Sequence, residues 1–272
     1  GTDILFAEEK IQQGRNFMNK LWNSTRFVLM NLDDELPINL SKLSDDKFDE
    51  TDRWILSKLN RTIEKVDIAY NNYKINEAVK IVYDFAWGDF CDWYVEFTKA
   101  RFYGLNTEDR KIAQSVSVHV LKQILQLLHP FAPFITEEIW SYFTTQKDGL
   151  ITLSQWPIPD KSLINKSTED SMQVIMDVIS AIRNVKTKLN ISPAKPISLA
   201  VRGEDSLTQR LVEHKDYLQR LARVEDISVG KNMEKPKQAA TAVLHQMEIF
   251  IPLEGLINID KEIDRLNQQI ED

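Results

Sequence analysis

Apolar side chains recur every three or four positions through most of the first half of this 272-residue chain. The segment "TDRWILSKLNRTIEKVDIAYNNY", residues 51–73, shows this pattern clearly. Its main apolar positions share one face of a helix, and they are Trp54, Ile55, Leu59, Ile63 and Val66. The N-cap is expected at Thr51 or Asp52. A helix with one apolar face must bury it against another element, so this half is predicted to be a packed set of helices.

The first 145 residues are predicted to form a helical bundle. Four to five helices are expected, at about residues 7–31, 51–73, 74–104, 107–129 and 133–145. Gly104 and Pro130 are the expected stops of the third and fourth helices. The segment "DDELPINLSKLSDDKFDE" lacks a sustained period and contains Pro37, so it is interpreted as a surface connection. Short loops between the helices favour a bundle.

The pattern changes after residue 150. Residues 146–169 are interpreted as a linker, and residues 170–254 as a small α+β module. Helices are expected there at residues 170–190 and 206–221. Short strand-like runs lie at residues 197–201, 226–230, 239–244 and 248–253. The predicted fold class is therefore mainly α, with a helical bundle followed by a small α+β module.

The last segment, residues 255–272, carries apolar residues at alternating steps of three and four. They are Leu256, Ile259, Ile263, Leu266 and Ile270. This is the a/d spacing of a coiled coil, but about two heptads are too few for an independent one. The segment is interpreted as the start of a coiled-coil arm, the first half of a helical hairpin.

Composition excludes several classes of protein. The single cysteine, Cys91, excludes an internal disulfide framework and a multi-cysteine zinc site. No apolar run is long enough to span a membrane, and the first residues resemble neither a signal nor a transit peptide, so a cytoplasmic location is expected. The net charge of −7 argues at first against a nucleic-acid partner. However, the charge is unevenly distributed. Eight acidic residues lie between Asp33 and Asp52, whereas the region from Arg183 to Lys237 is basic, with twelve Lys/Arg against seven Asp/Glu. The net charge therefore does not exclude a nucleic-acid partner.

No set of residues predicts an active site. The chain has no Gly-rich phosphate loop and no HExxH or CxxC spacing. His119, among apolar residues, and His129, before Pro130, are interpreted as structural. No catalytic residue and no metal ligand is therefore predicted.

The first predicted helix carries polar and aromatic side chains on the side away from its apolar stripe. The stripe in "GRNFMNKLWNSTRFVLMN", residues 14–31, consists of Met18, Leu21, Trp22 and Leu29, extended by Ile11 and Leu32. The opposite side carries Asn16, Lys20, Asn23 and Phe27. A ring flanked by a cation and amides suits stacking against a nucleic-acid base, and it equally suits a helix buried on two sides.

Several segments resemble the valyl-tRNA synthetase family. "GRNFMNKLWNSTRFVLMN" is similar to the first anticodon-domain helix of that family, and "DRWILSKLN", "FCDWYVEFTKARFY" and "LLHPFAPFITEEIW" are similar to its later helices in order and spacing. The last two indicate the valine, isoleucine and leucine branch of class I synthetases. Within that branch, "NFMNKLWN", "CDWYVE" and "IPLEGLINIDKEIDRL" favour valine.

The resemblance implies that this chain is the C-terminal, anticodon-binding part of a longer enzyme. The parent would use ATP with Mg²⁺ to attach valine to tRNA(Val), and it would hydrolyse mischarged threonyl-tRNA. The HIGH and KMSKS signatures and the editing domain do not occur in these residues. The chain alone is therefore expected to be inactive and to need no cofactor, and the parent is expected to be a monomer.

The resemblance also implies site residues. Lys20, Asn23 and Phe27 are expected to contact the middle and third anticodon bases, with Arg15 and Asn16 as further candidates. The tRNA backbone is expected to meet a basic surface that includes Lys186, Lys188 and Lys195. Two alternatives stay open at this point. One is an isoleucyl or leucyl anticodon domain, and the other is a helical protein-interaction scaffold that does not bind RNA.

Overall fold

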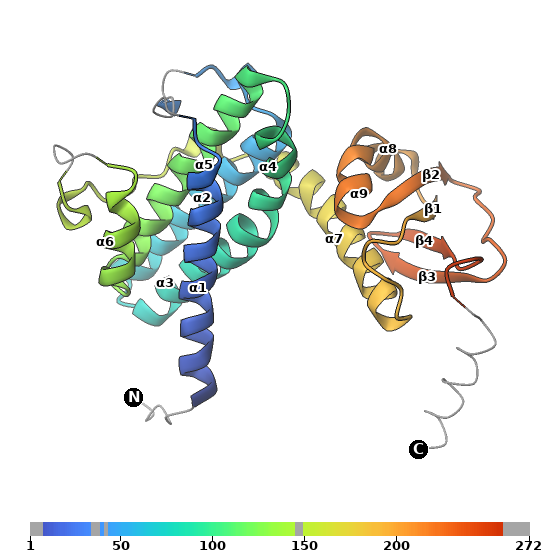
Figure 1. The fold of residues 1–272 in the computed structure, drawn as a ribbon, viewed down its shortest axis with the longest axis horizontal. Coiled ribbons are helices and arrows are strands. Elements are labelled where there is room, and N and C mark those ends of the chain that lie inside the picture. Colours follow the sequence, from blue (N-terminus) through green and yellow to red (C-terminus); the bar gives the residue numbers. More distant parts are fainter. Residues whose placement is uncertain (1–7, 34–38, 41–42, 145–148, 258–272) are drawn as a thin grey trace. The chain divides into compact units, whose positions relative to one another are not determined.

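The computed structural model describes residues 8–33, 39–40, 43–144 and 149–257. The chain divides into two compact units, residues 1–169 and residues 170–272 (Figure 1). The first unit is helical, and the second combines helices with one small sheet. This confirms a mainly α chain with a small α+β module. The finer division expected from the sequence, at residues 145/146, 169/170 and 254/255, stays a prediction.

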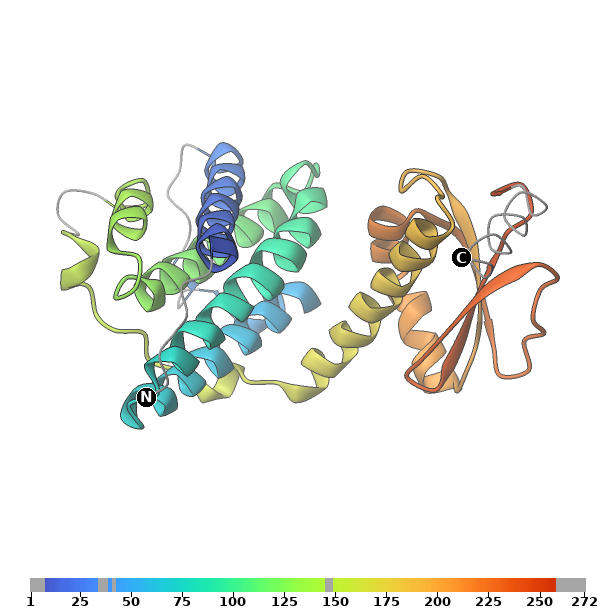
Figure 2. The same cartoon turned by 90° about the horizontal axis from the view of Figure 1, so that it is seen from below.

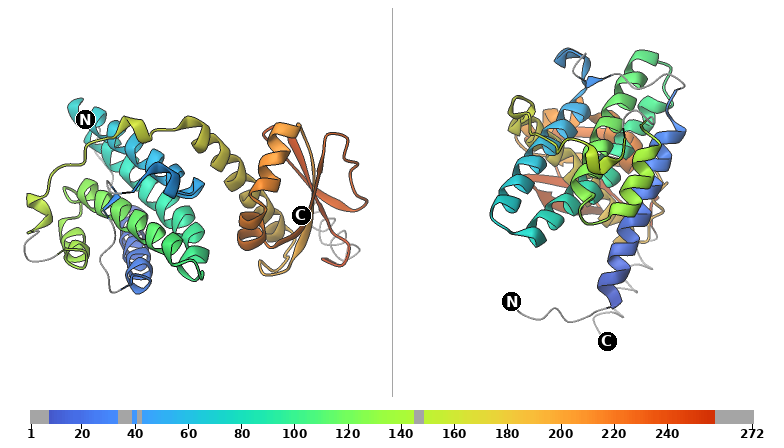
Figure 3. Two further views of the ribbon diagram at one scale, coloured as in Figure 1. Left: turned by 90° about the horizontal axis from the view of Figure 1, so that it is seen from above. Right: turned by 90° about the vertical axis from the view of Figure 1, so that its left-hand side faces the viewer.

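The first unit is a bundle of helices joined mostly by short connections. Its elements are α1 (Glu8–Met30), α2 (Glu50–Asn71), α3 (Ile75–Asp84), α4 (Val95–Phe102), α5 (Thr107–Leu128) and α6 (Pro133–Ser141). Short 3-10 turns lie at Asp45–Lys47, Ile151–Leu153 and Lys161–Leu163. The first turns of α1 project beyond the rest of the bundle (Figures 1 and 3), and residues 8–16 are all exposed.

The N-cap of α2 differs from the predicted one. Asp49 caps the helix, and its carboxylate accepts a hydrogen bond from the backbone N–H of Asp52. The Asp52 side chain accepts one in return from the backbone N–H of Asp49, which completes a capping box. The prediction of Thr51 or Asp52 was wrong because Asp52 occupies the third position of the box. The five apolar residues predicted to share one face of α2 are all buried, which confirms that prediction.

The predicted helix at residues 74–104 is a continuous helical rod of mixed geometry. Between α3 and α4 the chain adopts a π-helix over Phe85–Tyr94, here called the π segment. At its end, the backbone N–H of Val95 donates to the carbonyl of Phe90, five residues earlier. The wider turn changes the angle between successive side chains, which a strict period of 3.6 residues does not anticipate.

Helix α1 is rotated relative to the predicted stripe. Its buried residues are Phe17, Leu21, Ser24, Thr25 and Val28. Met18, Trp22 and Leu29 are only half-buried, and Ile11 is 58% exposed. The prediction was wrong in part because two of the positions that face the core are a serine and a threonine. The Thr25 hydroxyl donates to the carbonyl of Leu21, so its polar group is matched inside the helix.

The segment interpreted as a linker lies along α2. The Trp156 indole N–H donates to a carboxylate oxygen of Asp67 at 2.9 Å. The backbone N–H of Asp160 donates to the side-chain oxygen of Asn60 at 2.7 Å. The Ile151 side chain is buried. This connection is therefore packed against the bundle.

The second unit is a four-stranded sheet with helices on one side (Figure 2). Its elements are α7 (Lys166–Lys188, which begins in the first unit), β1 (Ile197–Arg202), α8 (Asp205–Glu213), α9 (Lys215–Ala222), β2 (Val224–Gly230), β3 (Ala239–Leu244) and β4 (Met247–Pro252). The strand order is β2-β1-β4-β3. Strands β1 and β2 pair in parallel, so their connection must cross over, and α8 and α9 form it. The other two pairs are antiparallel.

The four predicted strands are confirmed, each within two residues at its ends. The helix predicted at residues 206–221 is instead two helices, because the backbone leaves helical geometry at His214 with φ −104° and ψ 24°. The predicted coiled-coil arm lies almost wholly in residues 258–272, which are outside the described residues. Of its apolar positions only Leu256 is described, and its backbone N–H donates to the carbonyl of Leu253.

Candidate nucleic-acid interface

A groove of about 540 Å³ runs between α1 and the π segment with α4. One side is lined from α1 by Asn16, Asn19, Lys20, Asn23, Ser24 and Phe27. The other side is lined by Trp87, Cys91, Val95, Glu96 and Lys99. Four of the five residues predicted to contact the anticodon thus line one groove. The fifth, Arg15, is exposed on α1 and does not line it.

Phe27 provides an aromatic surface at one end of the groove. Its ring is half-buried and packs on Phe102, with ring centroids 5.7 Å apart and a tilt of 32°. The Lys99 ammonium lies 5.7 Å from the Phe27 ring centroid, at the outer range of a cation–π contact. The two interpretations left open for this ring therefore both hold in part. Phe27 packs inside the bundle and also lines the groove.

Lys20 is held in place by two partners. Its ammonium pairs with the carboxylate of Asp92 and lies 4.2 Å from the centroid of the Trp87 ring. Trp87 in turn packs against Phe17 and Tyr83. Lys20 is thus a positioned cation with a carboxylate beside it, suited to donating a directed hydrogen bond.

Amide side chains of α1 also line the groove. Asn23 is exposed at the groove, and Asn16 accepts a hydrogen bond from the Gln12 amide at 3.2 Å. An asparagine amide both donates and accepts, so it can match the edge of an unpaired base. The floor includes Cys91, where burial raises the thiol pKa to about 11 and keeps it neutral. Such a neutral floor suits a flat base better than a phosphate.

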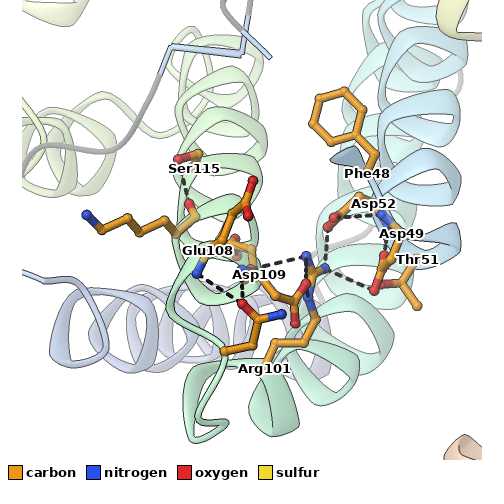
Figure 4. A network of polar contacts seen from close by, with 12 residues as sticks. Phe48, Asp49, Thr51, Asp52, Arg101, Glu108, Asp109 and Ser115 are labelled. Atoms are coloured by element: carbon orange, nitrogen blue, oxygen red, sulfur yellow. Dashed lines mark hydrogen bonds and ion pairs between the residues drawn. The ribbon is translucent and has the colours of Figure 1, made fainter. Parts of the chain in front are cut away.

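The groove wall formed by α4 is anchored by a buried polar cluster (Figure 4). The Arg101 guanidinium donates to Asp52 of α2 at 2.8 Å and to Asp109 of α5 at 2.8 Å, and it lies 3.1 Å from Asp49. The Tyr94 hydroxyl donates to the same oxygen of Asp52 at 2.7 Å. The cluster ties three helices together and so fixes the helix that carries Glu96 and Lys99.

Burial and ion pairing have opposite effects on the pKa values of Asp52 and Arg101 in this cluster. Burial, and then the neighbouring charge of Asp49, raise the pKa of Asp52 to about 6. Burial also acts against the charge of Arg101, but the Asp52 carboxylate outweighs it and raises the arginine pKa. At pH 7 Asp52 is mostly ionised and paired with Arg101. The cluster is explained as a structural ion pair and supplies no reactive group.

The groove residues that sequence reasoning missed come from the π segment and α4. Trp87, Glu96 and Lys99 lie at least sixty residues beyond Phe27 in the chain. The signal that could have found Glu96 and Lys99 is "FCDWYVEFTKARFY", which carries aromatic and charged side chains close together. Their place opposite α1 depends on the packing of the bundle.

The three lysines predicted to meet the tRNA backbone have different surroundings. Lys186 is 3% exposed, and its ammonium donates to the carbonyls of Pro193, Lys195 and Ala222 at 3.3, 2.6 and 3.0 Å. It cannot reach a phosphate, so its assignment was wrong. Its role is to hold the loop before β1 and the end of α9. Lys195 is half-buried and donates to the carbonyl of Gly255, whereas Lys188 is exposed.

The described residues offer neither a metal site nor a membrane-spanning helix. Among these residues, no group of three or more His, Cys, Asp or Glu side chains could hold a metal ion. No helix in the described part of the chain is long and apolar enough to cross a membrane. His119, which sequence reasoning interpreted as structural, lines a different cavity of about 640 Å³ together with Gln123 and Leu59.

Comparison with known proteins identifies the family. The sequence profile described as "Anticodon-binding domain of tRNA ligase" matches residues 52–201, which is more than half of the chain. The chain belongs to this family. The π segment and α4, which form one side of the candidate groove of this anticodon-binding domain, lie inside the matched range. The other side of the groove, α1, precedes that range.

Relatives of this anticodon-binding domain cover its whole length, α1 included. The chain is 39% identical over 276 residues to a valine–tRNA ligase of Geobacillus stearothermophilus and 36% identical over 272 residues to one of Enterococcus faecalis. Both matches cover 100% of this chain, which spans about 31% of the length of these relatives. A solved LeuRS–tRNA–LeuAMS complex from Agrobacterium radiobacter K84 shares 22% identity and a TM-score of 0.43, over 60% of this chain and 18% of that one. That likeness is too distant to bear on function.

Proposed function

We propose that this chain binds tRNA(Val) by holding unstacked anticodon bases in the groove between α1 and α4. The observation that carries the proposal is the convergence of Lys20, Asn23 and Phe27 on one groove with an aromatic surface at each end. RNA-binding proteins recognise loops by stacking splayed bases on aromatic rings and by hydrogen bonding to base edges. The similarity to valine–tRNA ligases supports valine tRNA as the partner.

Each predicted residue has a distinct part in this proposal. Phe27 offers the open part of its ring to a base, and such stacking contributes about 1–3 kcal/mol per base. Asn23 pairs with the edge of that base or its neighbour. Lys20, positioned by Asp92 and Trp87, donates to an acceptor atom or a phosphate oxygen. Asn16 extends the groove, while Arg15 contributes charge beside it.

The proposal places the chain in a larger enzyme. That enzyme would attach valine to tRNA with ATP and Mg²⁺ and would hydrolyse mischarged threonyl-tRNA, acting in the cytoplasm as a monomer. The sequence has no Gly-rich phosphate loop, and the described residues contain no group of three or more His, Cys, Asp or Glu side chains that could hold a metal ion. No step of that chemistry is therefore assigned to them. Lys188 and Lys195 stay candidates for backbone contacts.

The test is a fluorescence-anisotropy titration of this chain against a valine anticodon stem-loop at two salt concentrations. Phe27→Ala should weaken binding roughly fivefold or more, because a stacked base loses its platform. Phe134→Ala is the matched control, since Phe134 is 91% exposed on α6 and does not line the groove. A stem-loop with its middle anticodon base changed should bind more weakly to the unchanged chain.

Other outcomes separate the alternatives. Equal effects of the two phenylalanine substitutions would remove the base-binding role of the groove. A protein scaffold predicts no salt-sensitive RNA binding, whereas a phosphate-binding protein loses affinity as salt rises because bound counterions are released. Tighter binding to an isoleucine or leucine stem-loop would contradict the valine assignment. No binding of any stem-loop would contradict the proposal for this chain.

A further inference from the structure

The groove contains a carboxylate that is linked through one lysine to the aromatic ring on which a base would stack. Glu96 lines the groove on α4 and lies 2.5 Å from the ammonium of Lys99, three residues further along. The same ammonium is 5.7 Å from the Phe27 ring centroid. One lysine therefore connects the carboxylate and the ring. No residue predicted from the sequence explains why an acidic side chain lies in a site for an anionic polymer.

The ion pair between Glu96 and Lys99 is open to exchange. Both side chains are partly exposed, at 35% and 43%, and neither is enclosed by the core. Exposed pairs at this spacing hold weakly, because water solvates both ions well. Another partner of either ion can therefore replace the pair at little cost. An RNA loop brings two such partners, a phosphate for Lys99 and an amino group for Glu96.

A carboxylate distinguishes bases by one substituent. It accepts a hydrogen bond from the amino group at C4 of cytosine or C6 of adenine. Uracil and guanine carry a carbonyl oxygen at the corresponding positions, and two acceptors facing each other repel. Glu96 would thus favour an amino-bearing base and disfavour a keto base. The first two bases of every valine codon are G and then U. They pair with cytosine at the third and adenine at the middle anticodon position, and both of these bases bear the amino group.

We propose that Glu96 is a specificity-determining residue that selects an amino-bearing base, adenine or cytosine, at the Phe27 end of the groove. The inference rests on the proposed function and adds to it the chemical rule by which the groove rejects other bases. When the base stacks, Lys99 leaves Glu96 for a phosphate, and the freed carboxylate accepts from the amino group. Without RNA, the charges of Glu96 and Lys99 cancel, so this pair adds no net charge to the groove.

The test compares amino and keto bases in stem-loops bound to the unchanged chain and to Glu96→Gln. In one stem-loop hypoxanthine replaces the middle adenine, and in another uracil replaces the third cytosine. The unchanged chain should bind at least one keto stem-loop roughly tenfold more weakly than the parent. Glu96→Gln should reduce that preference to about twofold or less, since an amide both donates and accepts. The affected position identifies the base that Glu96 reads.

A matched control comes from α3. Glu77 forms an exposed pair with Lys74, also three residues apart, at 3.0 Å, and neither residue lines the groove. Glu77→Gln makes the same change in net charge and should leave the amino preference unchanged. Circular dichroism of both variants checks that each is folded.

The inference and the proposed function fail differently. If Phe27→Ala weakens binding but Glu96→Gln keeps the full amino preference, the groove binds bases and Glu96 does not select them. If Glu77→Gln alters the preference as much as Glu96→Gln, the effect is general electrostatics and the inference is overturned. If Phe27→Ala has no effect, the proposed function itself is overturned.

Discussion

At the scale of single residues, a buried charge in this protein can be matched by backbone partners alone. Lys186 illustrates this, because three backbone carbonyls surround its buried ammonium. Burial lowers the pKa of this lysine, and the charge of Arg223 adds to the effect. A basic residue counted from the sequence as a tRNA contact is thus part of the core, where an unmatched charge would be costly.

His119 should make the bundle sensitive to acid. Burial, with the charge of Lys122, lowers its pKa to about 4 from an ordinary value of 6.5, so folding favours the neutral ring. Its contribution to the free energy of unfolding is present above pH 6.5 and is lost as the pH falls through 4. Between pH 7 and 4.5, His119→Gln should lose less stability than the unchanged protein, by at most about 3 kcal/mol.

Urea unfolding of both proteins at several pH values measures this difference. Asp52 acts in the opposite direction. Because its pKa is raised, its contribution to the free energy of unfolding falls as the pH rises from about 4 to 6. Asp52 is present in both proteins, so its effect cancels in the comparison. If the two proteins lose equal stability in acid, the His119 ring has its ordinary pKa in the folded protein, which would contradict this prediction.

At the scale of elements, local geometry decides which side chains meet. The π segment is helical by pattern, and its wider turns place Trp87 and Cys91 opposite α1. Helix α1 approaches the bundle through Ser24 and Thr25 together with its apolar residues. Each element is therefore of the predicted type, while its orientation depends on its neighbours.

The hairpin between β3 and β4 offers a test at this scale. Its two turn residues, His245 and Gln246, have φ of 49° and 62°, in the left-handed region that favours glycine. His245 also contacts the Asp177 carboxylate at 2.6 Å, so it is better kept. Gln246→Gly should stabilise the second unit by roughly 0.5–1 kcal/mol, because relief of backbone strain exceeds the added freedom of the unfolded chain. Thermal unfolding followed by circular dichroism measures this, and a lower midpoint for the variant would contradict it.

At the scale of the whole molecule, the chain has two cores. Residues 1–169 and 170–272 form separate compact units, and each buries its own apolar side chains. A protein with two cores need not unfold in one step. The candidate groove belongs wholly to the first unit. Substitutions that destabilise only the second unit should therefore leave the proposed anticodon binding intact.

Matched leucine substitutions test this independence. Leu121 on α5 and Leu211 on α8 are both fully buried, one in each unit. Each Leu→Ala substitution should cost about 2–5 kcal/mol in its own unit, because it leaves a cavity. Scanning calorimetry should show two transitions, of which each variant lowers only one. A single transition lowered equally by both variants would mean that the units unfold together.

The amino-acid sequence by itself determined the type of most elements and the family. Helical spacing of apolar residues identified α2 and α5, and short β-branched runs identified all four strands, because these patterns are local. Motifs in the α1, α2, α4 and α6 segments carried the resemblance to tRNA synthetases, and that resemblance implied anticodon contacts for Lys20, Asn23 and Phe27.

Only the tertiary structure decided which residues share the groove and which are buried. Glu96 and Lys99 face Phe27 because the bundle brings distant segments together, and no local pattern encodes that pairing. Lys186 is buried where the carbonyls of two segments, the loop before β1 and the end of α9, converge on its ammonium. The rotation of α1 likewise depends on packing. Local spacing sets the periodicity of an element, whereas its partners, and with them the chemistry of the site, are set by contacts between residues far apart in the chain.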